Sequence, residues 1–123
     1  MSQKPLDFSL LLKSKLSRRS FVADEVIFRE GDKAEALFVI EKGQVEIQGG
    51  RRVVAILGPG EFFGEMSLVD PAPRSGTAVA VTDVTLVPVS EKEFLRIVGE
   101  TPSFALDLMR LFVRRIRARD GYY

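Results

Sequence analysis

The segment 58–76, GPGEFFGEMSLVDPAPRSG, holds residues whose types and spacing suit chemistry on an anion. Arg74 follows nine residues after Glu65, so a loop of this length can return and bring both side chains to one place. The planar fork of an arginine donates two parallel hydrogen bonds to a phosphate. A carboxylate repels a phosphate, so Glu65 must serve another part of the ligand, such as a sugar hydroxyl.

Several features predict that this segment is a fixed loop. Its glycines permit positive φ or close approach of another backbone. Phe62 and Phe63 are predicted to anchor it in the core. Residues 65–69 are predicted to form one short helical turn, and the backbone N–H groups at the start of such a turn bind anions. The segment therefore predicts a phosphate site built from an arginine and main-chain amides.

Composition excludes several other kinds of site. The chain has no Cys and no His, which removes a thiolate nucleophile, a Ser-His-Asp triad and a histidine-ligated metal barrel of the cupin type. We expect no enzyme and no cofactor. With 18 basic and 17 acidic side chains, the net charge of +1 gives no bulk attraction to nucleic acid. No apolar run reaches the length of a membrane span, and residues 1–16 lack a signal-peptide pattern, so the cytoplasm is the expected location.

The elements that must position the site are mostly short strands. The 123 residues predict one domain, 1–123. An N-terminal helix is predicted within 1–18, with helical spacing over 7–17. Ser90 and Glu93 form a capping box, and Pro102 suits the first turn of a last helix, so two helices are predicted within 90–119. Between them, over 19–89, the predicted strands are 19–22, 25–28, 36–41, 44–48, 52–57, 77–81 and 85–89.

This order of elements predicts a mainly β fold with flanking helices. We expect an antiparallel, jelly-roll-like β-barrel (a double-stranded β-helix) because several short strands recur without intervening helices. The segment 58–76 lies between two strands of that barrel. The Gly49-Gly50 pair predicts a tight hairpin.

These motifs resemble the cyclic nucleotide-binding domains, a family that includes regulatory subunits of protein kinase A, the bacterial catabolite activator protein and cyclic nucleotide-gated channels. The sequences FGEMSL and PRS within 58–76 are similar to the family's phosphate-binding cassette. The runs FREGD, LFVI, GQV and LGPGEFF look like its barrel pattern. The resemblance covers roughly residues 20–119.

The resemblance implies a role for each cassette residue. Glu65 would accept a hydrogen bond from the ribose 2′-hydroxyl, and Arg74 would pair with the cyclic phosphate. The backbone N–H groups of Ser67 and Ser75 would donate to that phosphate, and Gly64 would admit the sugar closely. The ligand-binding residues implied are Gly64, Glu65, Met66, Ser67, Arg74 and Ser75. Gly76 departs from the pattern, since the family often has Ala there.

The last helix is the expected lid and transmitter. Phe104, Leu108 and Leu111 lie along one stripe, and four residues further the stripe reaches Arg115. In the family this helix covers the base, so Arg115 is the residue expected to contact the purine. The same apolar face offers a site for a homodimer, and the helix end offers a link to an attached effector domain.

The sequence leaves several functions open. The favoured one is a regulatory sensor that binds cAMP in preference to cGMP. A second is a degenerate barrel without nucleotide binding, used for protein contacts. A third is a fragment of a DNA-binding regulator, because only four residues follow Arg119 and they hold no helix-turn-helix.

Overall fold

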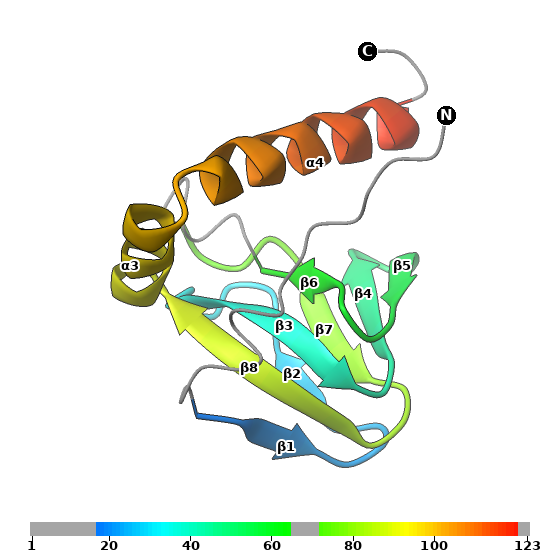
Figure 1. The fold of residues 1–123 in the computed structure, drawn as a ribbon. Coiled ribbons are helices and arrows are strands. Elements are labelled where there is room, and N and C mark those ends of the chain that lie inside the picture. The colour runs from blue at the N-terminus through cyan, green and yellow to red at the C-terminus, as the bar shows by residue number, and fades with distance from the viewer. Residues whose placement is uncertain (1–16, 65–71, 121–123) are drawn as a thin grey trace. The chain divides into compact units, whose positions relative to one another are not determined.

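The computed structural model describes residues 17–64 and 72–120, with residues 115–120 described as backbone only. The described residues divide into a β unit that ends at Glu91 and a helical unit that begins at Lys92. The β unit contains these strands: β1 Arg19–Phe21, β2 Val26–Phe28, β3 Ala36–Lys42, β4 Val45–Gly49, β5 Arg52–Leu57, β6 Phe62–Phe63, β7 Thr77–Ala80 and β8 Val84–Ser90 (Figure 1).

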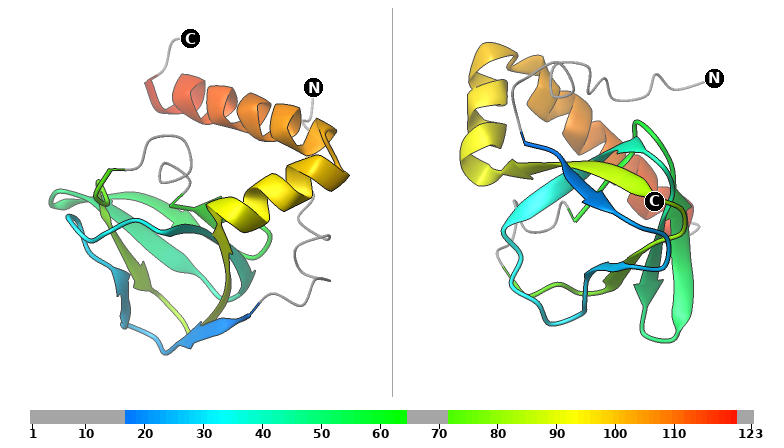
Figure 2. Two further views of the ribbon diagram at one scale, coloured as in Figure 1. Left: turned by 90° about the vertical axis from the view of Figure 1, so that its left-hand side faces the viewer. Right: turned by 90° about the horizontal axis from the view of Figure 1, so that it is seen from below.

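The strands form two four-stranded sheets. Their orders are β1-β8-β3-β6 and β2-β7-β4-β5, and each pairing is antiparallel. Figure 2 shows the two sheets curving around a common interior. The pair β3 and β8 is the longest, with Leu37 opposite Val89 and Ile40 opposite Leu86. This is the antiparallel barrel that the strand pattern predicts.

Both sheets contribute to one core. Successive side chains of a strand point to opposite faces, so alternate residues enter the interior. Ala78 and Ala80 of β7 are both fully buried, whereas their neighbours are only partly buried. The core cluster consists of Phe38, Ile40, Val45, Phe63, Ala78, Ala80, Val84 and Leu86. Phe63 belongs to this core although it lies in the segment 58–76, so the core itself fixes one end of the candidate site.

Two helices follow the strands: α3, Glu91–Glu100, and α4, Ser103–Asp120. Apart from Glu91, the first residue of α3, both lie in the helical unit. Helix α3 begins directly after Ser90, as the predicted capping box requires, and α4 begins directly after Pro102. The rings of Phe94 and Phe104 meet edge to face at 6.0 Å between centroids, which joins the two helices. No helix among the described residues has the length and apolar character needed to cross a bilayer.

The structure corrects some predicted boundaries. The helix predicted within 1–18 lies outside the described residues except for Ser17 and Arg18, and these two are not helical. The barrel extends to Ser90 rather than to residue 89, and α4 extends to Asp120 rather than Arg119. The short strand β6 was not predicted. The single domain 1–123 stays a prediction.

Candidate functional site

The segment 58–76 leaves the barrel through β6. Phe62 and Phe63 are 1% and 3% exposed, which confirms their predicted role as anchors. They pair with β3, Phe62 opposite Val39 and Phe63 opposite Phe38. The described parts of the segment are 58–64 and 72–76. Its two ends are therefore both fixed, one by β6 and the other by the start of β7.

Arg74 joins these two ends through its side chain. It is only 8% exposed. Its Nη1 donates to the backbone carbonyl of Gly64 over 3.0 Å, and its Nη2 donates to that of Ala36 over 2.7 Å. Hydrogen bonds from a charged donor are the stronger kind. The guanidinium therefore lies against the last residue of the segment's first part and the first residue of β3.

An aromatic cluster supports the same guanidinium. Its carbon lies 4.2 Å from the centroid of Phe28 and 5.7 Å from that of Phe38. The rings of Phe28, Phe38 and Phe63 lie 5.4 to 6.2 Å apart in pairs. A cation over an aromatic face is attracted by the ring quadrupole, more strongly when water is excluded. The core thus presents a positive charge near the end of the segment 58–76.

Position 64 favours glycine over every other residue type, for two reasons. Its φ is +76°, a left-handed conformation that costs residues with a Cβ about 1–2 kcal/mol. A Cβ at Gly64 would also lie 2.7 Å from Nη1 of Arg74. The glycine therefore permits the guanidinium to reach its backbone.

Gly76 is required for a different reason. A Cβ there would lie 2.6 Å from the backbone oxygen of Gln48, on the neighbouring strand β4. The resemblance led us to expect Ala at this position, and the close approach of β4 to the start of β7 is a local reason for Gly instead.

The backbone of Arg74 is held as firmly as its side chain. Its N–H donates to the carbonyl of Asp32 over 2.8 Å, and its carbonyl accepts from the N–H of Gly31 over 2.8 Å. Both partners lie in the turn between β2 and β3. The N–H of Glu30, in the same turn, donates to Oγ1 of Thr77 over 3.1 Å.

The structure brings together some of the predicted site residues. Gly64 and Arg74 are in contact, and Ser75 is exposed beside Arg74. Glu65, Met66 and Ser67 lie outside the described residues. Arg115 lies in α4, but its side chain is also outside the described part, so the roles of these four residues stay predictions.

Sequence reasoning missed the residues that hold Arg74. They are Phe28, Ala36 and the turn 29–32. A signal was available, because FREGD was among the motifs of the resemblance, but the motif did not indicate which residue of the segment 58–76 it would contact.

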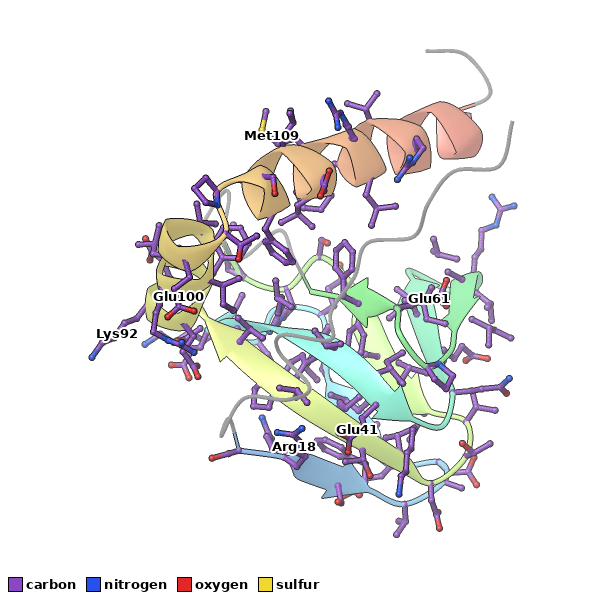
Figure 3. The ribbon with its side chains drawn as sticks, in the orientation of Figure 1. Arg18, Glu41, Glu61, Lys92, Glu100 and Met109 are labelled. Carbon is purple, nitrogen blue, oxygen red and sulfur yellow. The ribbon has the colours of Figure 1, made fainter. Side chains whose placement is uncertain are left out.

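A second arginine, Arg18, pairs with Glu41 of β3. Its Nη2 lies 3.1 Å from Oε2 of Glu41, and Figure 3 shows the two side chains facing each other. Each side chain is 28% exposed, so this is a partly buried ion pair. Within residues 17–64 and 72–120, no three His, Cys, Asp or Glu side chains gather as a metal site would need.

Comparisons with known proteins agree with this geometry. Residues 18–101 match the family model described as "Cyclic nucleotide-binding domain". The cyclic AMP receptor protein of Thermus thermophilus is 38% identical over 115 residues, which are 89% of this chain and 53% of that protein. The chain thus spans about half the length of this curated relative.

Two solved structures extend the likeness to three dimensions. The catabolite activator protein of Thermus thermophilus superposes with a TM-score of 0.81 at 37% identity, covering 91% of this chain and 55% of that one. A structure titled "A cyclic-GMP-dependent signalling pathway regulates bacterial phytopathogenesis" superposes with a TM-score of 0.79 at 30% identity, covering 89% and 92%. This chain belongs to the family of cyclic nucleotide-binding domains.

Proposed function

We propose that this chain is a regulatory sensor that binds cAMP in preference to cGMP, and that Arg74 bonds the cyclic phosphate. The observation that carries the proposal is the buried guanidinium at the end of the cassette, bonded to Gly64 and Ala36 and stacked on Phe28. Taking a cation out of water is costly. A phosphodiester bound at that guanidinium supplies the opposite charge and acceptors that match its planar fork.

Calorimetric titration of the purified chain tests this. We expect cAMP to bind with a Kd of about 1 µM or lower, or roughly −8 kcal/mol. Arg74→Ala should raise the Kd about 10- to 150-fold, the equivalent of one lost charged hydrogen bond. Arg74→Lys, which keeps the charge but not the fork, should give a smaller rise.

Arg18→Ala is the matched control, because it also removes a partly buried arginine, one bonded to Glu41 instead. Its Kd should stay within about twofold of wild type. An unchanged Kd in Arg74→Ala refutes the phosphate role. A wild-type chain that binds neither nucleotide refutes the sensor and favours a barrel used for protein contacts.

We propose that Glu65 accepts a hydrogen bond from the ribose 2′-hydroxyl. The backbone N–H groups of Ser67 and Ser75 are proposed to donate to the phosphate. The support is chemical: a carboxylate accepts from a hydroxyl and repels a phosphate. The Glu65→Ala variant should bind cAMP more weakly than wild type does. The two proteins should bind 2′-deoxy-cAMP equally tightly. A large difference between the two proteins toward 2′-deoxy-cAMP contradicts the assignment.

The preference for cAMP is supported by the name of the relative that is 38% identical, a cyclic AMP receptor protein. A neighbour with a similar TM-score comes from work on a cyclic-GMP-dependent pathway, so the fold by itself does not decide between the two nucleotides. We expect the Kd for cAMP to be lower than that for cGMP in parallel titrations. The reverse order refutes this part of the proposal.

Helix α4 is proposed as the lid, with Arg115 contacting the purine. Phe104 and Leu108 are 5% and 4% exposed, and Leu111 is partly buried, so the stripe that leads to Arg115 is a buried one. Nucleotide should then slow amide hydrogen exchange over α4. Arg115→Ala should weaken cAMP binding without lowering thermal stability, and equal exchange with and without nucleotide contradicts the lid.

A homodimer through α4 is a second proposal, carried by a separate observation. Leu106, Met109 and Val113 are 49%, 60% and 44% exposed, and their spacing of three and four residues puts them on one stripe. Figure 3 shows Met109 projecting from the helix. Such a stripe fits the seam of a helix pair.

Sedimentation analysis tests the dimer. Met109→Lys should shift the chain to monomer, whereas Leu95→Lys, at an equally exposed position of α3, should not. A wild-type chain that stays monomeric at about 100 µM refutes the dimer. Because the chain spans about half of its curated relative, we propose that α4 passes the nucleotide signal to an attached effector domain.

A further inference from the structure

Three turns of the described residues share one construction. They are Val22–Glu25, Arg29–Asp32 and Gly58–Glu61. In each, the N–H of the fourth residue donates to the carbonyl of the first, over 3.0, 3.0 and 3.1 Å. The N–H of the first residue donates to the carboxylate of the fourth, over 3.0, 2.9 and 2.7 Å. The acidic residue at the fourth position is therefore bonded twice to the first residue, once through its backbone N–H and once through its carboxylate.

The third residue of each turn has a positive φ, which is 72° at Asp24, 90° at Gly31 and 85° at Gly60. This is the third-position conformation of a type II turn. It directs the third N–H and the fourth carbonyl outward, where they bond the carbonyl and N–H of one residue on another segment. The residues held in this way are Ala80, Arg74 and Ile40, in the order of the turns, with bonds of 2.7 to 2.9 Å.

Each of these turns acts as a backbone clamp on one residue. Two clamps hold residues of the core, because Ile40 and Ala80 are fully buried aliphatic residues of β3 and β7. The third clamp holds Arg74, the basic residue of the segment 58–76. The carboxylate of Asp32 accepts from the backbone N–H of Arg29, and its carbonyl accepts from the backbone N–H of Arg74, so Asp32 acts on Arg74 through the backbone of the turn.

We propose that Asp32 is a positioning residue for the phosphate arginine. Its carboxylate closes the turn 29–32, and the closed turn fixes the backbone of Arg74. That backbone sets where the guanidinium stands between Gly64, Ala36 and the ring of Phe28. A bidentate bond to phosphate depends on the position and angle of both terminal nitrogens, so loosening this backbone weakens the bond. The inference rests on the proposed function.

The test compares two matched variants by titration with cAMP. Asp32→Ala removes the acceptor of the Arg29 N–H and should raise the Kd about 3- to 10-fold, less than the full loss of the arginine. Glu25→Ala removes the corresponding bond of the clamp that holds Ala80 and should leave the Kd unchanged while lowering thermal stability by a similar amount. Asp32→Asn, which keeps one oxygen acceptor, should restore most of the affinity.

A double-mutant cycle separates positioning from a general loss of structure. In the Arg74→Ala background, Asp32→Ala should cause no further loss of affinity. Amide hydrogen exchange at Arg74 should also speed up in Asp32→Ala and not in Glu25→Ala. If Asp32→Ala does not fold, Thr77→Val removes the second tie of the same turn, the acceptor of the Glu30 N–H, and should show the same coupling with Arg74.

The outcomes distinguish this inference from the proposed function. A wild-type chain that binds no cyclic nucleotide overturns both. If Arg74→Ala weakens binding but Asp32→Ala behaves like Glu25→Ala, only the positioning role is overturned. Losses from Asp32→Ala and Arg74→Ala that simply add also overturn it, because Asp32 then acts independently of the arginine.

Discussion

Replacing Gly64 by Ala tests the geometry around Arg74. The left-handed φ of +76° costs an alanine about 1–2 kcal/mol, of which about 0.4–1 kcal/mol is offset by the lower entropy of the unfolded chain. The new Cβ would lie 2.7 Å from Nη1 of Arg74, so the guanidinium must move from the Gly64 carbonyl. Losing that charged hydrogen bond costs a further 1.5–3 kcal/mol, roughly. We expect a total destabilisation of about 2–4 kcal/mol.

Gly60→Ala is the matched control for this substitution. Gly60 has a similar φ of +85°, but a Cβ there would meet nothing within 4 Å. It should therefore lose only about 1 kcal/mol, the backbone cost alone. Urea unfolding measures both stabilities, and titration with cAMP measures both affinities. Affinity should fall in Gly64→Ala alone. Equal losses of stability in the two variants, with equal affinities, would refute the contact between Gly64 and Arg74.

Three further substitutions test the barrel and its edges. Gly76→Ala should cost about 1–3 kcal/mol in urea unfolding, since its Cβ would lie 2.6 Å from the oxygen of Gln48, whereas Gly58→Ala, with open space at its Cβ, should cost almost nothing. Leu86→Ala, at a fully buried core position, should lower the free energy of unfolding by about 2–5 kcal/mol, and a loss under 1 kcal/mol would place that side chain outside the core. Arg18→Ala should cost no more than about 1 kcal/mol, because its ion pair is 28% exposed on each side; a larger loss of thermal stability would count against this.

Local sequence signals were sufficient for most of the elements. A continuous apolar run located β3, in which the consecutive residues 37–40 are all buried, and alternation of apolar residues located β4. The capping box at Ser90 located the start of α3, because a helix needs side-chain partners for its first N–H groups. The strand β6 escaped because two residues are too few to show a period. The residue type of Arg74 and its distance from Glu65 indicated it as a phosphate ligand, a role that stays a prediction.

Contacts between distant segments could not be obtained in this way. Phe28 precedes Arg74 by 46 residues, and neither its type nor its neighbours indicate that its ring lies 4.2 Å from the guanidinium. The same holds for Ala36, which contributes only a carbonyl that any residue carries.

The amino-acid sequence alone determined the family pattern, the order of the strands along the chain, and the choice of Arg74 and Gly64 as candidate site residues. These depend on residue type and short spacing. Only the tertiary structure decided how that arginine is held. The turn 29–32 has the same local construction as two other turns of the chain, and what distinguishes it is the residue that the folded barrel brings against it. Residue types do not indicate which backbone groups will bond to each other, since every residue but proline has the same backbone donor and acceptor.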